Sequence, residues 1–335
     1  MAAPAPAASS APRAGATQPE PTLVRLTDLQ ITGGAGEYIA AEQGYFRAEG
    51  IEPEFVRLAT TDLLPSLVAG QVDVVAGIIV GSALFNAFAR GIPVKIVADH
   101  GANLPNASGG AVVLGKDFVA SGAYQRPADL RGRKVALTTL GGAPDLIMDR
   151  FLRSDGLTIA DVETVVMPFP DMLPALGNGA VDAAWSQEPF TTIGVERGLL
   201  VRGPTGHDIY PDQQIGLLVF GERMLSDRPL AVHFLRAYVR GVRDYVRAMQ
   251  EHDPAAVKEV VPILIEHTTM KDPALYEKVV PSGLRPDPLP NVQSIADDQD
   301  WYLAHGHQTQ RINTQDFVDT SFVEQAIREL GAASR

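Results

Sequence analysis

The segment Trp185-Ser186-Gln187-Glu188-Pro189-Phe190 places an aromatic ring, an amide and a carboxylate at the predicted end of a strand. Together these groups can stack on a flat molecule and exchange hydrogen bonds with its edge. A tryptophan that only fills the core is the alternative interpretation. No nucleophile stands beside a base here, so the segment indicates recognition rather than covalent chemistry.

A second candidate lies at residues 138–145, where a glycine-rich turn joins a predicted strand to a predicted helix. Free amides of Thr139, Gly141 and Gly142 at a helix N-terminus can hold an anionic or strongly accepting group. An ordinary glycine-rich turn is the alternative.

Most catalytic and cofactor chemistry has no support in the sequence. The chain has no cysteine, and it lacks a phosphate-binding loop, a nucleophile elbow and a His-Glu-x-x-His motif. The turn Gly33-Gly34-Ala35-Gly36 lacks the third glycine of a dinucleotide loop. We therefore predict no catalytic residue, no metal site and no cofactor.

The elements that must position these residues come in two similar halves. Leu64-Pro65-Ser66-Leu67 through Asp73 reappears 109 positions later as Leu173-Pro174-Ala175-Leu176 through Asp182. This period is far longer than that of a solenoid, whose units have about 20–50 residues. The repeat predicts two α/β lobes that face each other across a cleft.

Apolar runs and helical patterns alternate along both halves, which predicts an α/β fold with a parallel sheet in each lobe. Predicted strands cover residues 23–29, 52–58, 72–76, 94–98, 111–114, 134–138, 164–167, 181–185 and 214–220, and the chain after residue 228 is mostly helical. We predict a flexible tether at 1–21, a first lobe of 22–115 and 216–335, and a second lobe of 116–215. Two strands, near 111–114 and 214–220, should form the hinge.

Loops at the carboxyl ends of parallel strands line the binding crevice. That rule selects the candidate ligand-binding residues Gln30, Thr32, Tyr38, Thr60, Thr61, Ile79, Ser82, His100, Thr139, Gly141, Gly142, Trp185, Gln187, Glu188 and Gln214.

The net charge of −12 and the absence of a Lys/Arg cluster disfavour nucleic acid and anionic membranes as partners. The longest apolar run, residues 74–85, is too short to span a bilayer. The Ala/Pro-rich first 21 residues are typical of the tether behind a lipidated cysteine, with Met1 standing in its place. A ragged N-terminus is the alternative.

Several motifs carry a resemblance to a known family. Glu37-Tyr38-Ile39-Ala40, Gly44-Tyr45-Phe46, the Leu-x-x-Gly-x-Val-Asp repeats, Asp129-Leu130-Arg131-Gly132 and Gln187-Glu188-Pro189-Phe190 resemble the nitrate/sulfonate/taurine and thiamine-precursor group of ABC-importer substrate-binding proteins. The resemblance implies a type II periplasmic-binding-protein fold with a two-strand hinge. It also implies an extracytoplasmic receptor, expected as a monomer, that delivers a small molecule to a membrane permease.

The predicted ligand class follows from the absence of Lys and Arg residues among the candidate ligand-binding residues at the predicted strand ends. Between residues 135 and 195 the only basic residues are Arg150 and Arg153, both inside a predicted helix. An arginine fork, the strongest way to bind a sulfonate, is therefore not expected in the cleft. An aromatic or heteroaromatic ligand is favoured, with an organic anion as the alternative. An enzyme of the same fold and a ligand-sensing module are the alternatives of other classes.

Overall fold

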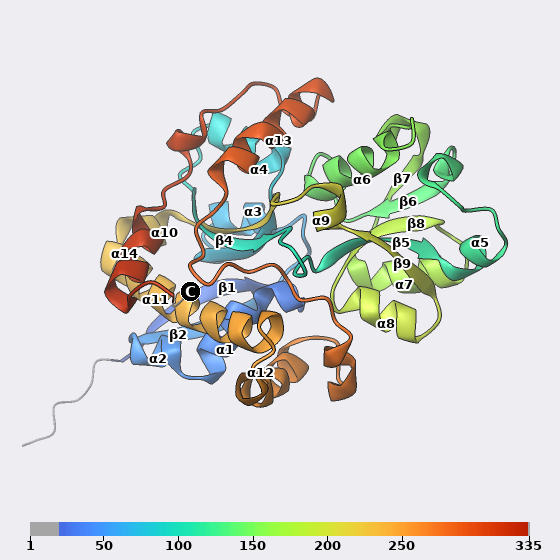
Figure 1. The fold of residues 1–335 in the computed structure, drawn as a ribbon. Helices are drawn as coiled ribbons and strands as arrows, with labels where there is room; N and C mark the ends of the chain where they lie inside the picture. The colour runs from blue at the N-terminus through green and yellow to red at the C-terminus, as the bar shows by residue number, and fades with distance from the viewer. Residues whose placement is uncertain (1–19, 334–335) are drawn as a thin grey trace, which may run out of the picture.

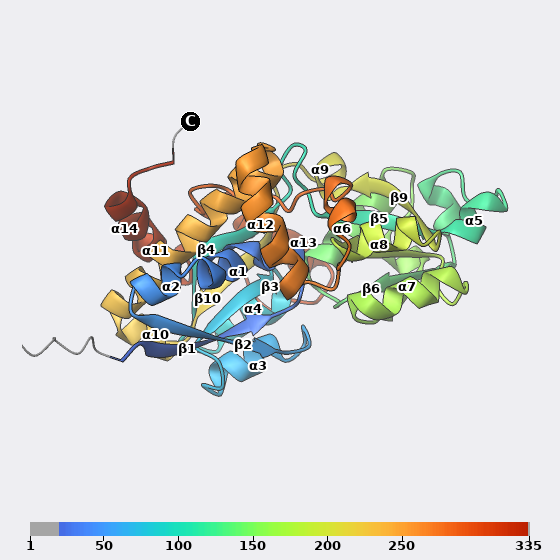
Figure 2. The ribbon, with the colours of Figure 1, turned by 90° about the horizontal axis from the view of Figure 1, so that it is seen from below.

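The computed structural model describes residues 20–333, and two five-stranded sheets organise them into two lobes that lie side by side (Figures 1 and 2). The first sheet has the order β2-β1-β3-β10-β4. Its strands are β1 (Thr22–Asp28), β2 (Ile51–Arg57), β3 (Val74–Ile79), β4 (Lys95–Ala102) and β10 (Gln214–Phe220). We call this sheet and its helices the first lobe.

The second sheet has the order β7-β6-β8-β5-β9, and with its helices it forms the second lobe. Its strands are β5 (Gly110–Gly115), β6 (Lys134–Leu137), β7 (Glu163–Val166), β8 (Ala183–Gln187) and β9 (Leu200–Thr205).

Both sheets are mixed, because one strand in each runs antiparallel to its neighbours. β10 runs antiparallel to β3 and β4, and β5 runs antiparallel to β8 and β9. β5 and β10 are the strands that the chain forms directly after it crosses from the other lobe. Each therefore begins at the edge of its sheet where the parallel strands end. The other pairs, β1–β2, β1–β3, β6–β7 and β6–β8, are parallel as expected.

Helices cover both faces of the first sheet. One face packs on α1 (Ala35–Glu42), α2 (Tyr45–Ala48), α11 (Arg228–Tyr245) and α12 (Pro254–His267), and the other packs on α3 (Leu63–Val68), α4 (Ser82–Ala89) and α13 (Val292–Ala304). The short α10 (Glu222–Ser226) follows β10, and α14 (Ser321–Leu330) packs on α11.

The second sheet is covered in the same way. α6 (Ala143–Arg153) packs on one face, and α7 (Phe169–Gly177) and α8 (Phe190–Glu196) pack on the other. The short helices α5 (Lys116–Ala120) and α9 (Gly206–Ile209) lie at its rim. Single helical turns occupy Thr32–Gly34, Pro127–Leu130, Ile159–Asp161, Val246–Gln250, Pro273–Glu277 and Thr314–Asp316.

The sequence repeat corresponds to one structural unit used twice, because its first copy forms α3 and leads to β3 and its second forms α7 and leads to β8. The repeated aspartate does the same work in each copy. Asp73 Oδ2 accepts the amide of Arg25 at 2.8 Å, and Asp182 Oδ2 accepts that of Lys134 at 3.0 Å. Each carboxylate therefore binds the backbone of the neighbouring parallel strand, which is β1 in the first sheet and β6 in the second.

The chain passes between the lobes at residues 103–109 and again at 206–213, just before the strands expected to form the hinge. The two crossings are hydrogen-bonded, since Asn103 N donates to Gln213 O at 2.9 Å and Asp212 N donates to Asn103 O at 2.8 Å. The predicted tether lies, up to residue 19, outside the described residues. From residue 20 to 333, no helix is long and apolar enough to cross a membrane.

Candidate ligand-binding site

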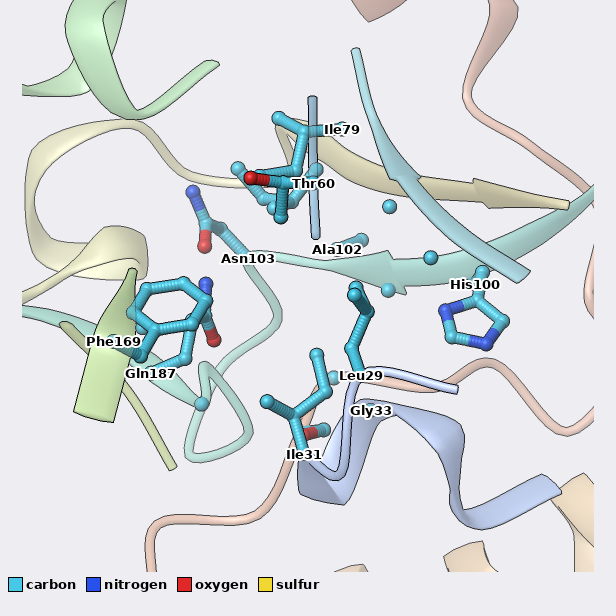
Figure 3. Close-up of a pocket in the computed structure, with 18 residues that line it drawn as sticks. Leu29, Ile31, Gly33, Thr60, Ile79, His100, Ala102, Asn103, Phe169 and Gln187 are labelled. Atoms are coloured by element: carbon cyan, nitrogen blue, oxygen red, sulfur yellow. The ribbon is translucent and has the colours of Figure 1, made fainter. Parts of the chain in front are cut away.

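A cavity of about 50 Å³ lies between the lobes, and we call it the chamber (Figure 3). Both lobes and the first crossing contribute to its wall. The lining residues are Leu29, Ile31, Gly33, Thr60, Gly77, Ile79, His100, Gly101, Ala102, Asn103, Gly109, Gly110, Phe169, Gln187, Ile215, Gly216, Ser282 and Gly283.

Strand ends position much of this wall. Leu29 and Ile31 follow β1, Ile79 ends β3, and Gln187 ends β8. Figure 3 places Phe169 and Gln187 on the side of the chamber opposite His100. A molecule held in the chamber would therefore contact both lobes at once, and such contacts favour a closed arrangement.

The polar part of the wall consists of neutral donors and acceptors. The amides of Asn103 and Gln187 and the hydroxyls of Thr60 and Ser282 belong to it. Ser282 Oγ lies 2.9 Å from the Thr32 hydroxyl, which fixes its position. Among the described residues that line the chamber, none is Lys or Arg, and His100 is the only ionisable group.

His100 forms a buried ion pair with Glu37. Its Nε2 atom lies 2.9 Å from Glu37 Oε1, and both side chains are almost completely buried. Burial is the strongest single influence and lowers the pKa of His100, but the charge of Glu37, a hydrogen bond to Glu37 and the charge of Asp99 together raise the pKa above its ordinary value. The imidazole thus has the character of a hydrogen-bond donor at the chamber wall.

Two further cavities meet the chamber at Thr60. The first, about 410 Å³, we call the mouth; Leu29, Thr60 and Phe169 line both it and the chamber, and the Asp28–Arg57 ion pair lies in its wall. The second, about 660 Å³, we call the groove. It is lined by Thr60, Thr61, Leu63, Leu64, Pro65, Val68, Ala69, Ile79, Gly81, Ala83, Leu84, Ala87, Arg90, Ile92, Thr139, Leu140, Gly141 and Gly142.

Backbone contacts join the lobes beside the groove. Gly81 and Gly142 form an antiparallel bridge. On either side of it, Ser82 N donates to Gly141 O at 2.8 Å and Ala143 N donates to Val80 O at 2.9 Å. A Cβ atom at Gly81 would lie 3.0 Å from the Gly141 oxygen and the Gly142 Cα, so glycine permits this approach.

These contacts occupy part of the predicted anion-binding turn. The amide of Ala143, in the first turn of α6, is bonded to the first lobe, and the amide of Gly141 donates to Asp145 Oδ2 at 2.8 Å. The turn here joins lobe to lobe, which leaves fewer free amides for a ligand anion.

Other contacts also join the lobes. The backbone amide of Thr32 donates to the Glu188 carbonyl at 3.3 Å, and the Lys278 ammonium lies 2.8 Å from Glu196 Oε2. Trp301 Nε1, on α13, donates to Asp149 Oδ2, on α6, at 2.8 Å.

The structure brings most of the sequence-predicted residues to these three cavities. Thr60, Ile79, His100 and Gln187 line the chamber; Thr60, Thr61, Ile79, Thr139, Gly141 and Gly142 line the groove; and Gln30, Thr60 and Thr61 line the mouth. Thr32 and Ser82 contact the opposite lobe instead.

Tyr38 and Trp185 lie away from the chamber. Tyr38 is buried, donates to Asp28 Oδ1 at 2.5 Å and stacks on His267, because α1 turns that ring toward the helices and not toward the cleft. Trp185 is fully buried and packs behind Gly110. β8 continues to Gln187, two residues past its predicted end, so Trp185 lies about 7 Å deeper along the strand.

Glu188 and Gln214 are engaged inside the protein. The Glu188 carboxylate accepts from Thr192 N at 3.0 Å and from Arg202 Nη2 at 2.6 Å. Gln214 Nε2 donates to Asp99 Oδ1 and to the Gly216 carbonyl, which fixes the start of β10. Both side chains support the site and do not line the chamber.

Sequence reasoning missed seven of the eleven non-glycine residues in the wall. Leu29 and Ile31 flank the candidate Gln30, and Phe169 lies two residues past the predicted strand 164–167, so a wider window at each strand end would have found them. Asn103 lies on a crossing, and Ser282 arrives from the C-terminal region. No local pattern marks either one.

One cluster of possible metal ligands lies on α1 and α12, at the surface and apart from the chamber. Ligand atoms of Glu42, Glu266 and His267 lie within 4.8 Å of one another. His267 Nε2 is already 2.9 Å from Glu42 Oε1. Two of the three ligand groups thus already contact each other.

Two lobes joined by two crossings, with a chamber between them, define the periplasmic-binding-protein fold. Solved structures confirm it. The nitrate-binding protein NrtA of Synechocystis PCC 6803 is 16% identical with a TM-score of 0.76, covering 94% of this chain and 90% of its own. The alkanesulfonate-binding protein SsuA of Xanthomonas axonopodis is 19% identical with a TM-score of 0.68, covering 90% and 99%. The desulfurization enzyme DSZB is 13% identical with a TM-score of 0.63, covering 92% and 100%.

Residues 32–252 match the NMT1/THI5-like family, and the chain belongs to that family. A Haemophilus influenzae protein named for thiamine biosynthesis is 32% identical over 145 residues, which is 43% of this chain and 43% of that protein. The 1,4-dihydroxy-6-naphtoate synthase of Streptomyces coelicolor is 30% identical over 151 residues, which is 45% of this chain and 51% of that enzyme. The matches thus span about half the length of these curated relatives.

Proposed function

We propose that the protein is an extracytoplasmic solute-binding receptor of an ABC importer that captures a small aromatic or heteroaromatic ligand between its lobes. The observation that carries this proposal is the interlobe chamber, whose wall combines neutral amides and hydroxyls with Leu29, Ile79 and Phe169. Such a wall suits a planar molecule with donors and acceptors at its edge. The receptor would act as a monomer and deliver its ligand to a membrane permease.

A simple organic anion fits this wall less well. The described chamber wall has no Lys or Arg, and the amides of Gly141 and Ala143 already have acceptors within the protein. A sulfonate or carboxylate would have to rely on His100 and neutral donors.

An enzyme acting in the same cleft is the second candidate. The His100–Glu37 pair at the chamber wall favours it, because an imidazole with a raised pKa can transfer a proton to a bound molecule. The similar proteins include a synthase and a desulfurization enzyme, which also supports the enzyme as a candidate function.

One experiment separates the two functions. Mass spectrometry of the natively purified protein should identify a carried ligand, and small-angle X-ray scattering should show that the stripped protein contracts when that ligand returns. Incubation followed by liquid chromatography should then recover the ligand unchanged. Conversion of the ligand to a product that depends on His100 would support the enzyme and refute the receptor.

Trp301 should report lobe closure by fluorescence. Its indole N–H binds Asp149 across the lobes, so a change of lobe arrangement alters its polar surroundings, whereas Trp185 is buried within one lobe. We expect Trp301→Phe to remove most of the ligand-induced change in emission and Trp185→Phe to leave it. A response that disappears only in the Trp185 variant would contradict this assignment.

A further inference from the structure

The chamber is too small for the whole of an aromatic ligand. A cavity needs about 10–15 Å³ to hold one water molecule. At about 50 Å³, the chamber has room for a polar group of a few non-hydrogen atoms, such as a carboxamide. In this closed arrangement the rest of a larger molecule must therefore extend beyond the chamber.

The groove lies next to the chamber, because Thr60 and Ile79 line both. Its wall is largely apolar and comes from both lobes, with α3 and α4 on one side and the turn at 139–142 on the other. Val68 and Leu140, one from each lobe, are 49% and 47% exposed there. Covering these side chains with an apolar group would remove that surface from water.

The mouth offers a less suitable environment. It also meets the chamber, but Asp28 and Arg57 form an ion pair in its wall. Placing an apolar group there would remove water from two charges. In the groove, Arg90 is the only charged residue among the described wall residues.

We propose that the ligand is amphipathic, with a small neutral head group bound in the chamber and an apolar part lying in the groove beside Thr60 and Ile79. This inference rests on the proposed receptor function and specifies its ligand. Asn103, Gln187 and Ser282 would bind the head group, and Val68 and Leu140 would cover the apolar part from the two lobes. The tail contacts would thus help to hold the lobes together.

The test uses benzamide and its 4-ethyl, 4-butyl and 4-hexyl homologues as probes in isothermal titration calorimetry. Each methylene that leaves water should raise the affinity about fourfold. The double variant Val68→Asn/Leu140→Asn should gain much less affinity per methylene than the parent. Because both side chains are half exposed, these changes should have little effect on folding.

Val166→Asn is the matched control, since Val166 is 52% exposed, lies in the same lobe as Leu140 and lines the mouth. It should keep the full dependence on chain length. An equal dependence in all variants, its loss in the control alone, or no binding of any homologue would overturn the inference. Lower cellular uptake with unchanged affinity in the double variant would also overturn it and would assign the groove to a partner protein.

The carried ligand gives an independent readout. A molecule with a polar head and an apolar extension supports the inference. A compact polar molecule that still contracts the protein would overturn the inference and leave the receptor function intact. Failure of the carried ligand to contract the protein would instead contradict the receptor function itself.

Discussion

Replacing Gly81 with valine should hold the lobes apart and weaken ligand binding about a hundredfold. Any side chain at position 81 meets backbone atoms, since its Cβ would lie 3.0 Å from the Gly141 oxygen and the Gly142 Cα. Backbone cannot rotate away as a side chain can. An overpacking penalty of up to about 3 kcal/mol on the closed state lowers the apparent affinity by about that factor.

The first lobe itself should tolerate this change. Gly81 has a φ of −177°, an extended conformation that valine adopts readily. Scattering should therefore show a folded protein with a larger radius of gyration that does not contract with ligand. Ala89→Val, at the far end of α4, is the control and should contract normally. A Gly81→Val protein that still closes and binds at full strength would disprove the role of this bridge.

The second large effect concerns stability and pH. Glu37→Gln removes the counter-charge of a buried imidazole, and breaking a buried pair in this way costs about 3–5 kcal/mol. The wild-type pKa of His100 is raised, so the pair stabilises the fold fully below the unfolded pKa of about 6.5 and less as the pH rises through the folded value. The difference in the free energy of unfolding between variant and wild type should therefore be large at pH 5.5 and smaller at a pH above the folded pKa of His100.

Urea unfolding at pH 5.5, 7 and 8.5 measures this difference. Asp99 and Tyr238 also face His100 and stay in place in the variant, so they do not account for the difference. Glu54→Gln, an exposed change on β2, is the matched control and should have little effect at any of these pH values. A difference of equal size at all three would show that the pair does not depend on the charge of His100.

The alternation of strands and helices could be predicted because it depends on short local patterns in the sequence. Apolar runs bounded by glycine turns predicted residues 23–29, 134–138 and 214–220 as strands, and the structure has strands at Thr22–Asp28, Lys134–Leu137 and Gln214–Phe220. β9 (Leu200–Thr205) was not predicted. It is an edge strand that pairs only with β5, and its Arg202, Gly203 and Pro204 hide the pattern of a buried strand.

The site could be predicted only where it depends on strand ends. Gln187 was predicted in this way. The predicted end of β8 was two residues too early, and this error placed Trp185 among the candidate ligand-binding residues. Ser282 and Gly283 could not be found from sequence. They reach the chamber because the C-terminal segment packs against β4, where Ala102 N donates to Gly283 O at 2.8 Å. Such pairings depend on how distant segments meet.

The insertion of β10 between β3 and β4 has a consequence for the order in which a ribosome completes the molecule. The second lobe is one continuous stretch that emerges while the first sheet still lacks this strand. The first lobe is the first to be synthesised but must complete its folding after the second lobe, although nascent chains generally fold from the N-terminal domain onward. Ser282 and Gly283 emerge later still. The wall of the chamber is thus incomplete until nearly the whole chain has been made. A partly synthesised chain therefore has no complete site that could bind a solute.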